Sequence, residues 1–178
     1  MVNKIVILRG INVGGKRKLL MADLKLMMKD LGHTDILTYI QSGNIIFKSN
    51  AENKVLEEQI EKAIRNKFGF DVPVIIRTPK ELENSIRKNP FYNTYSDIDN
   101  LYFTFLKEKP NKAHKQHTET YNYEPDKFVI EQKDVFIFCE GKYHQSKLSN
   151  NFFEKKLNVG ATTRNCKTVL KLMELASI

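Results

Sequence analysis

The chain has 178 residues, of which 41% are hydrophobic and 28% charged; this excludes a disordered chain and leaves room for one large domain or two small ones. The formal net charge is +8, with sixteen Lys and Arg against ten Asp and Glu in residues 1–89, and thirteen against eleven in residues 90–178. No apolar run reaches the ~18 residues of a membrane-spanning helix and no signal-peptide pattern opens the chain, so we expect a cytoplasmic protein without a membrane partner.

The first half of the chain predicts a split βαβ unit. Gly43 supplies a positive-φ position for a hairpin between two strands, Asn53 is expected to cap a helix, and Pro73 marks the fourth strand as an edge or entry strand. Strands are expected over residues 4–9, 36–40, 44–48 and 71–77, and amphipathic helices over residues 19–31 and 53–68. This order of elements is that of a ferredoxin-like half.

A similar order follows in the second half. Thr78-Pro79 begins a short helix through residue 87, and Asn89-Pro90 divides the chain. Strands are then expected over residues 101–106, 127–130 and 135–138, and helices over residues 111–120, 151–157 and 163–175. We therefore predict an α/β (α+β) protein with duplicated ferredoxin-like split βαβ units packed into one compact body: an N-terminal half over residues 1–89 and a C-terminal half with a helical C-terminus over residues 90–178.

Four segments resemble the hallmark motifs of one bacterial family. They are LRGINVGGK at residues 8–16, TYIQSGN at 38–44, SKLSN at 146–150 and ATTRN at 161–165. In order and spacing they are similar to domain-of-unknown-function family 1697, and the resemblance extends end to end. It implies a duplicated ferredoxin-like arrangement and supplies no established activity. This chain departs from the family's usual pattern in having Cys166 in place of a Trp, and His144-Gln145 near a usual Gly-Arg pair.

The glycine-rich turn after the first strand is the sharpest chemical signal. Five of the first eighteen residues are basic and none is acidic, and a strand that ends in such a turn presents backbone N–H groups and cations to an anion. Gly10-x-x-x-x-Gly15-Lys16 fits the beginning of a P-loop. Arg17 stands where a P-loop needs Ser or Thr, however, and a hairpin follows the helix, so we reject an NTPase. The alternative without a ligand is that Gly14-Gly15 only permits a sharp strand-to-helix turn.

A second cationic segment is expected at the start of the last helix, where a Thr cap leaves N–H groups that an anion could share with Arg164. The predicted anion-binding residues are Arg9, Asn12, Gly14, Gly15, Lys16, Arg164 and Asn165. Secondary candidates are Gln41, Ser42, Asn44, Lys147 and Thr163. Turn formation and helix capping explain the same residue types without a ligand.

Other kinds of site have less support. Ser146 and Lys147 are adjacent and point different ways, so they do not form a nucleophile with its base. His114 and His117 lack further ligands, and we predict neither a metal site nor a cofactor. The two cysteines form no C-x-x-C pair, which fits a reducing compartment. At the start of the last helix the dipole could lower the pKa of the Cys166 thiol, but burial as a small apolar residue is the commoner outcome.

Several functions remain open. The residue types of the first turn suit a pocket for a small ligand bearing phosphate or carboxylate, in an enzyme or a sensor. The alternatives are a nucleic-acid or polyanion binding module and a protein-interaction adaptor. Stacking of bases is disfavoured because the first strand has no aromatic residue and the third has only Phe47. These patterns identify neither a reaction nor the oligomeric state.

Overall fold

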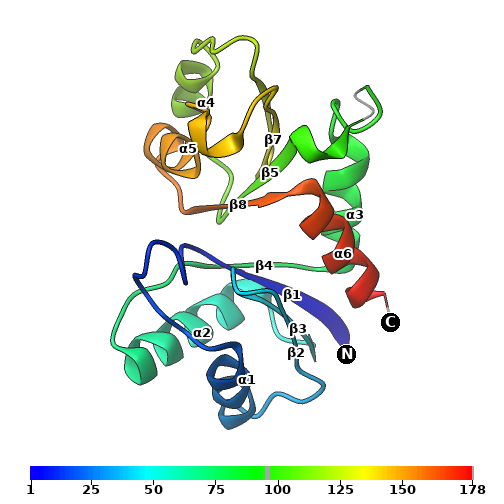
Figure 1. Ribbon diagram of the computed structural model, residues 1–178. Coiled ribbons are helices and arrows are strands. Elements are labelled where there is room, and N and C mark those ends of the chain that lie inside the picture. The colour runs from blue at the N-terminus through cyan, green and yellow to red at the C-terminus, as the bar shows by residue number, and fades with distance from the viewer. Residues whose placement is uncertain (95–96, 178) are drawn as a thin grey trace. The chain divides into compact units, whose positions relative to one another are not determined.

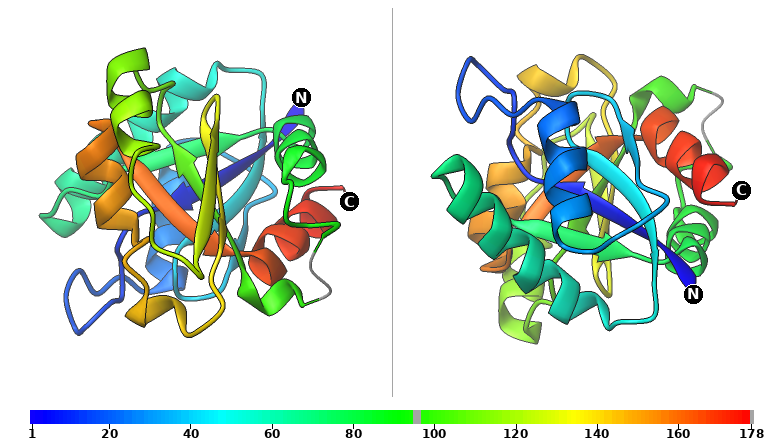
Figure 2. Two further views of the ribbon diagram at one scale, coloured as in Figure 1. Left: turned by 90° about the horizontal axis from the view of Figure 1, so that it is seen from above. Right: turned by 90° about the horizontal axis from the view of Figure 1, so that it is seen from below.

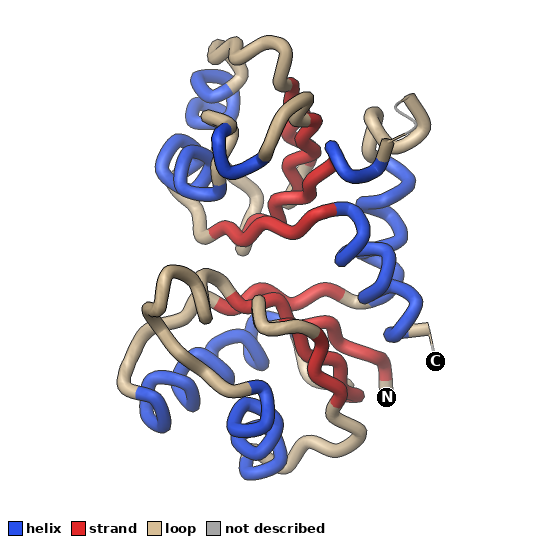
Figure 3. Tube along the Cα trace, viewed as in Figure 1, coloured by secondary structure: helices blue, strands red, loops and turns tan. Residues whose placement is uncertain are grey.

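The computed structural model describes residues 1–94 and 97–177. It contains two antiparallel sheets of four strands, each covered by helices (Figures 1 and 3). Two compact units divide the chain: Met1–Leu82 with Leu172–Ile178, and Glu83–Lys171. We call them the first and the second unit. The expected division after residue 89, and the expected packing into one compact body, stay predictions.

The first unit has the predicted order of elements. Its sheet runs β2-β3-β1-β4 with every neighbouring pair antiparallel. The elements are β1 (Val2–Leu8), α1 (Met21–Asp30), β2 (Leu37–Tyr39), β3 (Asn44–Ser49), α2 (Asn53–Phe68) and β4 (Val74–Arg77). The strand that Pro73 precedes, β4, lies at an edge of this sheet, as predicted.

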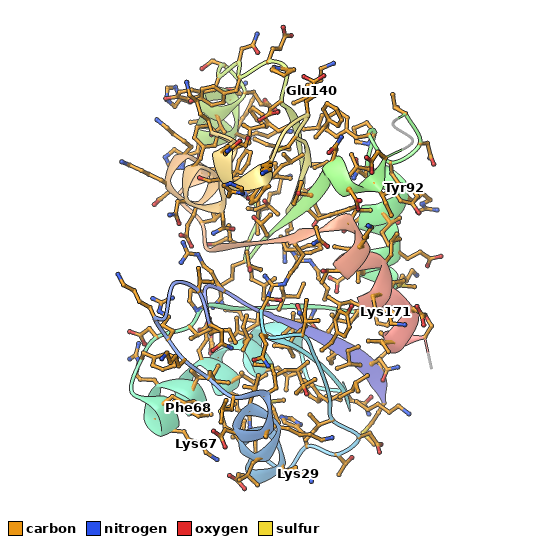
Figure 4. All side chains as sticks on the ribbon, in the orientation of Figure 1. Lys29, Lys67, Phe68, Tyr92, Glu140 and Lys171 are labelled. Carbon is orange, nitrogen blue, oxygen red and sulfur yellow. The ribbon has the colours of Figure 1, made fainter. Side chains whose placement is uncertain are left out.

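Both helices of the first unit lie side by side on one face of its sheet (Figure 2). Side chains alternate along a strand, so Val6 and Leu8 of β1 point to the same face, where they join Leu24 of α1 and Ile60 of α2 in one buried cluster. The outer faces of the helices are charged. Lys67 Nζ lies 3.1 Å from a carboxylate oxygen of Asp30 at the surface that Figure 4 labels with Lys29 and Lys67.

The second unit repeats this topology, because its sheet runs β6-β7-β5-β8. Helices α4 and α5 pack together, and α5 contributes Phe153 and Leu157 to the buried cluster of this unit. The elements are α3 (Pro79–Lys88), which starts in the first unit, η1 (Ile98–Asn100), β5 (Leu101–Leu106), α4 (Lys112–Thr118), β6 (Lys127–Glu131), β7 (Asp134–Phe138), η2 (Tyr143–Gln145), α5 (Asn150–Leu157), β8 (Ala161–Asn165) and α6 (Cys166–Ala176).

Hydrogen bonds at the ends of α3 and α6 agree with this division. In α3, Ser85 Oγ donates to Asp134 Oδ2 at 2.6 Å, within the second unit. In the first unit, Asn3 Nδ2 donates to the carbonyl oxygen of Ala176 in α6 at 2.7 Å. Each helix therefore leaves one unit and ends in the other.

Two local predictions were wrong. Residues 163–165 do not begin the last helix, because they belong to β8, which pairs with β5, and α6 starts only at Cys166. The threonines of this segment suit a helix cap and a strand equally well. The segment forms a strand because it pairs with the edge of β5 that β7 does not occupy. Asn53 is the first residue of α2 and Glu52 stands at the cap position. The side chain of Asn53 instead accepts a hydrogen bond from Lys4 Nζ at 2.8 Å.

In the part of the chain that the structure describes, no helix is both long and apolar enough to cross a membrane.

Candidate functional site

The loop after β1 is a small hairpin of its own and not a turn that leads straight into a helix. The Asn12 N–H donates to the Arg17 carbonyl at 3.2 Å, and the Lys16 N–H donates to the Val13 carbonyl at 3.0 Å. At the tip, Gly14 and Gly15 have φ of +58° and +74°, and two such residues are what a type I′ turn requires. Helix α1 begins only at Met21. We call residues 12–17 the basic hairpin; its shape corrects the expected strand-to-helix turn.

Asn12 anchors the basic hairpin. Its Oδ1 accepts from the Leu19 N–H at 2.8 Å, and its Nδ2 donates to the carbonyl oxygens of Leu19 at 2.9 Å and of Gln41 at 2.8 Å. Its φ of +55° is one that Asn tolerates better than most residues. The side chain predicted to bind an anion therefore holds the loop and joins it to the turn between β2 and β3, and its part in anion binding stays a prediction.

The turn between β2 and β3 is explained by its own hydrogen bonds. Asn44 is fully buried, and its Nδ2 donates to the Tyr39 carbonyl at 3.0 Å and to Ser42 Oγ at 3.2 Å. The Gly43 carbonyl accepts from the Leu8 N–H at 2.9 Å. These contacts assign structural roles to the secondary candidates Ser42 and Asn44.

The cations of the loop gather at the base and tip of the basic hairpin. Arg9 follows β1, and its N–H donates to the Pro73 carbonyl at 3.0 Å. Arg17 has a φ of +48°, and its Nη1 lies 3.4 Å from the place where a Cβ on Gly10 would stand. The guanidinium of Arg17 is therefore folded against the backbone that follows Arg9. Lys16 is exposed at the tip.

Arg17 is missing from the residues predicted to bind an anion. The Gly14-Gly15 pair is the sequence signal from which the position of Arg17 could have been predicted. Gly-Gly between two extended segments indicates a two-residue hairpin turn, and such a turn pairs Arg17 with Asn12.

The predicted residues of β8 have partners within the second unit. Arg164 is 8% exposed, its Nη1 donates to Thr162 Oγ1 at 3.1 Å and to the Thr163 carbonyl at 2.9 Å, and burial lowers its pKa to about 10. Thr163 Oγ1 lies 2.7 Å from Thr104 Oγ1. Asn165 Oδ1 accepts from the Thr168 N–H at 2.8 Å and so caps α6. Because Arg9 and Arg164 belong to different units, their convergence on one anion stays a prediction.

Arg164 has an equivalent in the first unit. Leu8 of β1 pairs with Val74 and Leu106 of β5 pairs with Ala161, and three residues further along each edge strand stand Arg77 and Arg164. Both are buried, at 4% and 8% exposed. In each, Nη1 donates to the carbonyl of the preceding residue, at 3.1 Å from Arg77 and 2.9 Å from Arg164. The duplication therefore extends from the order of the strands to this residue position.

An open hollow of about 490 Å³ lies in the second unit. It is lined by residues that include Asn122, Tyr123, Asp126, Gln145, Ser146 and Lys147. Ser146 Oγ donates to Asp126 Oδ2 at 2.5 Å, whereas Lys147 Nζ lies 5.4 Å from the ring centroid of Tyr123. Since these neighbouring side chains have different partners, Lys147 is not a base for Ser146. Sequence reasoning had named Lys147 but not the tyrosine beside it.

Neither cysteine has the properties of a reactive thiol. Cys139 and Cys166 are both buried and free of disulfides, and burial raises the pKa of each to about 11. The buried position of Cys166 is the one expected from the sequence. Among the described residues, no group of His, Cys, Asp and Glu could hold a metal ion.

Comparison with known proteins adds the family. No curated protein matches the chain. A solved structure, that of the conserved bacterial protein SP0830 from Streptococcus pneumoniae, is 26% identical over 98% of each chain, with a TM-score of 0.79. The profile of the family described as "Protein of unknown function (DUF1697)" matches residues 1–136, and the chain, with its glycine hairpin and its duplicated antiparallel sheets, belongs to this family.

Proposed function

We propose that the basic hairpin, together with Arg9, binds a small ligand that carries a phosphate or carboxylate group, in an enzyme or a sensor. The observation that carries the proposal is the conformation of Arg17. A residue other than glycine in the left-handed region costs about 1–3 kcal/mol, and such residues concentrate at ligand-binding positions. Arg17 adopts this conformation at +48°, and its guanidinium is folded against Gly10.

Charge supports an anionic ligand. Arg9, Lys16, Arg17 and Lys18 fall within ten residues, and the first acidic residue of the chain is Asp23. Guanidinium groups donate to phosphate and carboxylate in pairs of hydrogen bonds, and these are stronger than bonds between neutral groups. A simple connection between β1 and α1 requires no such accumulation of positive charge.

The site proposed here, the basic hairpin with Arg9, does not require several residues that were predicted from the sequence to bind an anion. Asn12 holds the loop, Gly14 and Gly15 shape its tip, and Asn165 caps α6. Each therefore has a structural role that is sufficient to explain it. A ligand that reaches Arg164 as well is the extended form of the proposal.

A small ligand is favoured over a single-stranded nucleic acid lying on the first sheet. Phe47 is the aromatic residue of β3, and it is fully buried in the helix-covered core, with its ring centroid 4.3 Å from that of His33. It offers no face on which a base could stack. Cytoplasmic location belongs to the same proposal, since two cysteines without a disulfide are typical of a reducing compartment.

Charge-neutralising variants test the proposal. We would measure binding of inorganic phosphate, pyrophosphate and citrate by calorimetry and thermal shift, using Arg17→Gln, with Lys62→Gln as a control that removes the same charge from an exposed position on α2. Charge-assisted hydrogen bonds contribute about 1.5–3 kcal/mol, so Arg17→Gln should weaken binding about tenfold or more. No anion binding, or an equal loss in both variants, would exclude a site at the basic hairpin.

A short oligonucleotide at two salt concentrations separates the alternative. Attraction by charge alone gives a Kd of about 10⁻⁴ to 10⁻⁶ M that weakens steeply with salt. If an oligonucleotide binds more tightly than this range and its binding depends on Arg17, the ligand of the basic hairpin is a polyanion and not a small molecule.

A further inference from the structure

The second unit carries a row of two tyrosine rings and two lysine ammonium groups. Tyr121 and Tyr123 belong to the segment between α4 and β6, and their ring centroids are 6.0 Å apart. Lys156 Nζ of α5 lies 4.6 Å from the Tyr121 centroid, and Lys147 Nζ lies 5.4 Å from the Tyr123 centroid. Each ring is therefore paired with a cation at a distance typical of a cation–π contact.

Tyr123 lies between two hollows. One is the hollow of about 490 Å³ described above, and the other, of about 470 Å³, is lined by residues that include Tyr121, Tyr123, Phe128 and Val129. Tyr123 lines both. Volumes of this size are typical of sites for small molecules, so the Tyr123 ring borders enough space for a planar ligand.

The two rings are held in place by an aromatic side chain from α5. Phe152 meets Tyr121 edge to face with centroids 5.4 Å apart, and it meets Tyr123 in the same manner at 5.6 Å. Lys156 Nζ also donates to the Tyr121 hydroxyl at 2.5 Å. A ring that is already fixed loses little conformational entropy when a ligand stacks on it.

We propose that this surface binds a nucleotide unit, with the base stacked on Tyr123 and the phosphate bound by Lys147 and Lys156. Every nucleobase has a π face, and alternating aromatic and cationic side chains are the general means of binding single-stranded nucleotides. Lys147, which covers the Tyr123 ring in the free protein, moves to the phosphate when a base takes its place. Asn122 lines both hollows, and its amide offers a donor and an acceptor to the edge of the base.

The carboxylates near the hollow orient the ligand. Asp126 accepts hydrogen bonds from Ser146 Oγ at 2.5 Å and from the Glu140 N–H at 3.0 Å, so it is committed to the local loop structure. Glu124 lines the same hollow and is exposed. Both repel a phosphate, which places the phosphate toward Lys147 and Lys156.

This site shares no residue with the basic hairpin and is independent of the function proposed above. A free mononucleotide and a single-stranded nucleic acid present the same base and phosphate. The two sources are distinguished by the probes: adenosine 5′-monophosphate measured by calorimetry, and a short fluorescent oligo(dA) measured by anisotropy at two salt concentrations.

Four variants of the full chain test the site. Tyr123→Ala removes the ring and should weaken binding about five- to hundredfold, the range expected for one stacked base, while Tyr123→Phe should bind as the unsubstituted chain does. Lys147→Ala should weaken oligo(dA) binding and reduce its salt dependence by about one phosphate contact. Lys109→Ala, which removes an exposed charge outside both hollows, is the control and should leave affinity unchanged.

Each outcome decides for or against the site. Binding of the mononucleotide that depends on Tyr123 supports the site with a free nucleotide as its ligand, and binding of oligo(dA) alone with the same dependence supports it with a nucleic acid. If neither probe binds, or if Tyr123→Ala and Lys109→Ala have equal effects, the proposal is overturned. Because Tyr123 packs on Phe152, Tyr123→Leu with an unchanged melting curve replaces Tyr123→Ala if the latter unfolds. Loss of binding in Arg17→Gln alone would assign the nucleotide to the basic hairpin and likewise overturn the proposal.

Discussion

Gly43 supports the loop that carries the basic hairpin, and replacing it by alanine should be costly for two separable reasons. Its φ is +83°, and a Cβ there would stand 2.5 Å from Ile11 Cδ1 and 3.0 Å from Leu8 Cβ. The left-handed conformation costs an alanine about 1–2 kcal/mol, and forced overpacking costs about 1–3 kcal/mol. We therefore expect Gly43→Ala to lower the free energy of unfolding by about 2–5 kcal/mol.

Gly69 provides the matched control. It has a similar φ of +78° at the end of α2, and no atom lies within 4 Å of the place where its Cβ would stand. Gly69→Ala should therefore show the conformational cost alone, about 1–2 kcal/mol. Urea unfolding followed by circular dichroism measures both. The additional substitution Ile11→Val removes the nearest atom and should restore part of the stability lost in Gly43→Ala, as a double-mutant cycle would quantify. Equal losses in Gly43→Ala and Gly69→Ala would refute the steric argument.

The remaining predictions concern the side chain of Asn12 and the two buried thiols. Asn12→Ala removes three hydrogen bonds and leaves an alanine in the left-handed conformation, so it should lower the free energy of unfolding in urea by about 2–4 kcal/mol. Asn12→Gly removes the same hydrogen bonds but relieves the backbone, so its loss of stability should be about 1 kcal/mol smaller. Equal losses of stability in the two variants would contradict a backbone contribution. Cys139 and Cys166 should react with a thiol reagent at mildly alkaline pH only as fast as the protein opens, because their pKa values of about 11 lie above the ordinary 9.0. A raised thiol pKa adds stability that is fully present below pH 9 and is lost as the pH approaches 11, so unfolding curves should shift to lower urea over that interval.

Sequence patterns predicted the fold well where local and tertiary preferences agree. Gly43 between two β-branched runs predicted the β2–β3 hairpin, and the structure has it. The prediction of a helix start at residues 163–165 was wrong, because this segment pairs with β5 although its threonines also fit a helix cap. The prediction that Asn53 caps a helix was also wrong, because its side-chain oxygen accepts a hydrogen bond from Lys4 on β1. In both cases the deciding partner is distant in sequence.

The candidate sites show the same dependence on distant partners. The basic character of the first loop was evident from composition, but the inward fold of Arg17 depends on the hairpin register that Gly14 and Gly15 set. The pairing of Lys147 with Tyr123 depends on two loops separated by β6 and β7, and no local motif predicts it. Local patterns therefore indicated which residues were chemically suited to a site, whereas the fold determined their neighbours.

The four segments that resemble family motifs separate residues needed by the fold from residues available for the proposed binding. Two motifs meet in the first unit, where Asn12 Nδ2 donates to the Gln41 carbonyl at 2.8 Å. The other two meet in the second unit, where Asn150 Nδ2 donates to the Ala161 carbonyl at 3.0 Å. An asparagine from one motif thus holds the backbone of the next in each unit, and changing either should reduce stability. The lysine of each pair of motifs is exposed instead, Lys16 at the hairpin tip and Lys147 beside the hollow. Since an exposed lysine contributes little to folding, these are the positions at which we expect substitution to test the proposed binding while leaving the fold intact.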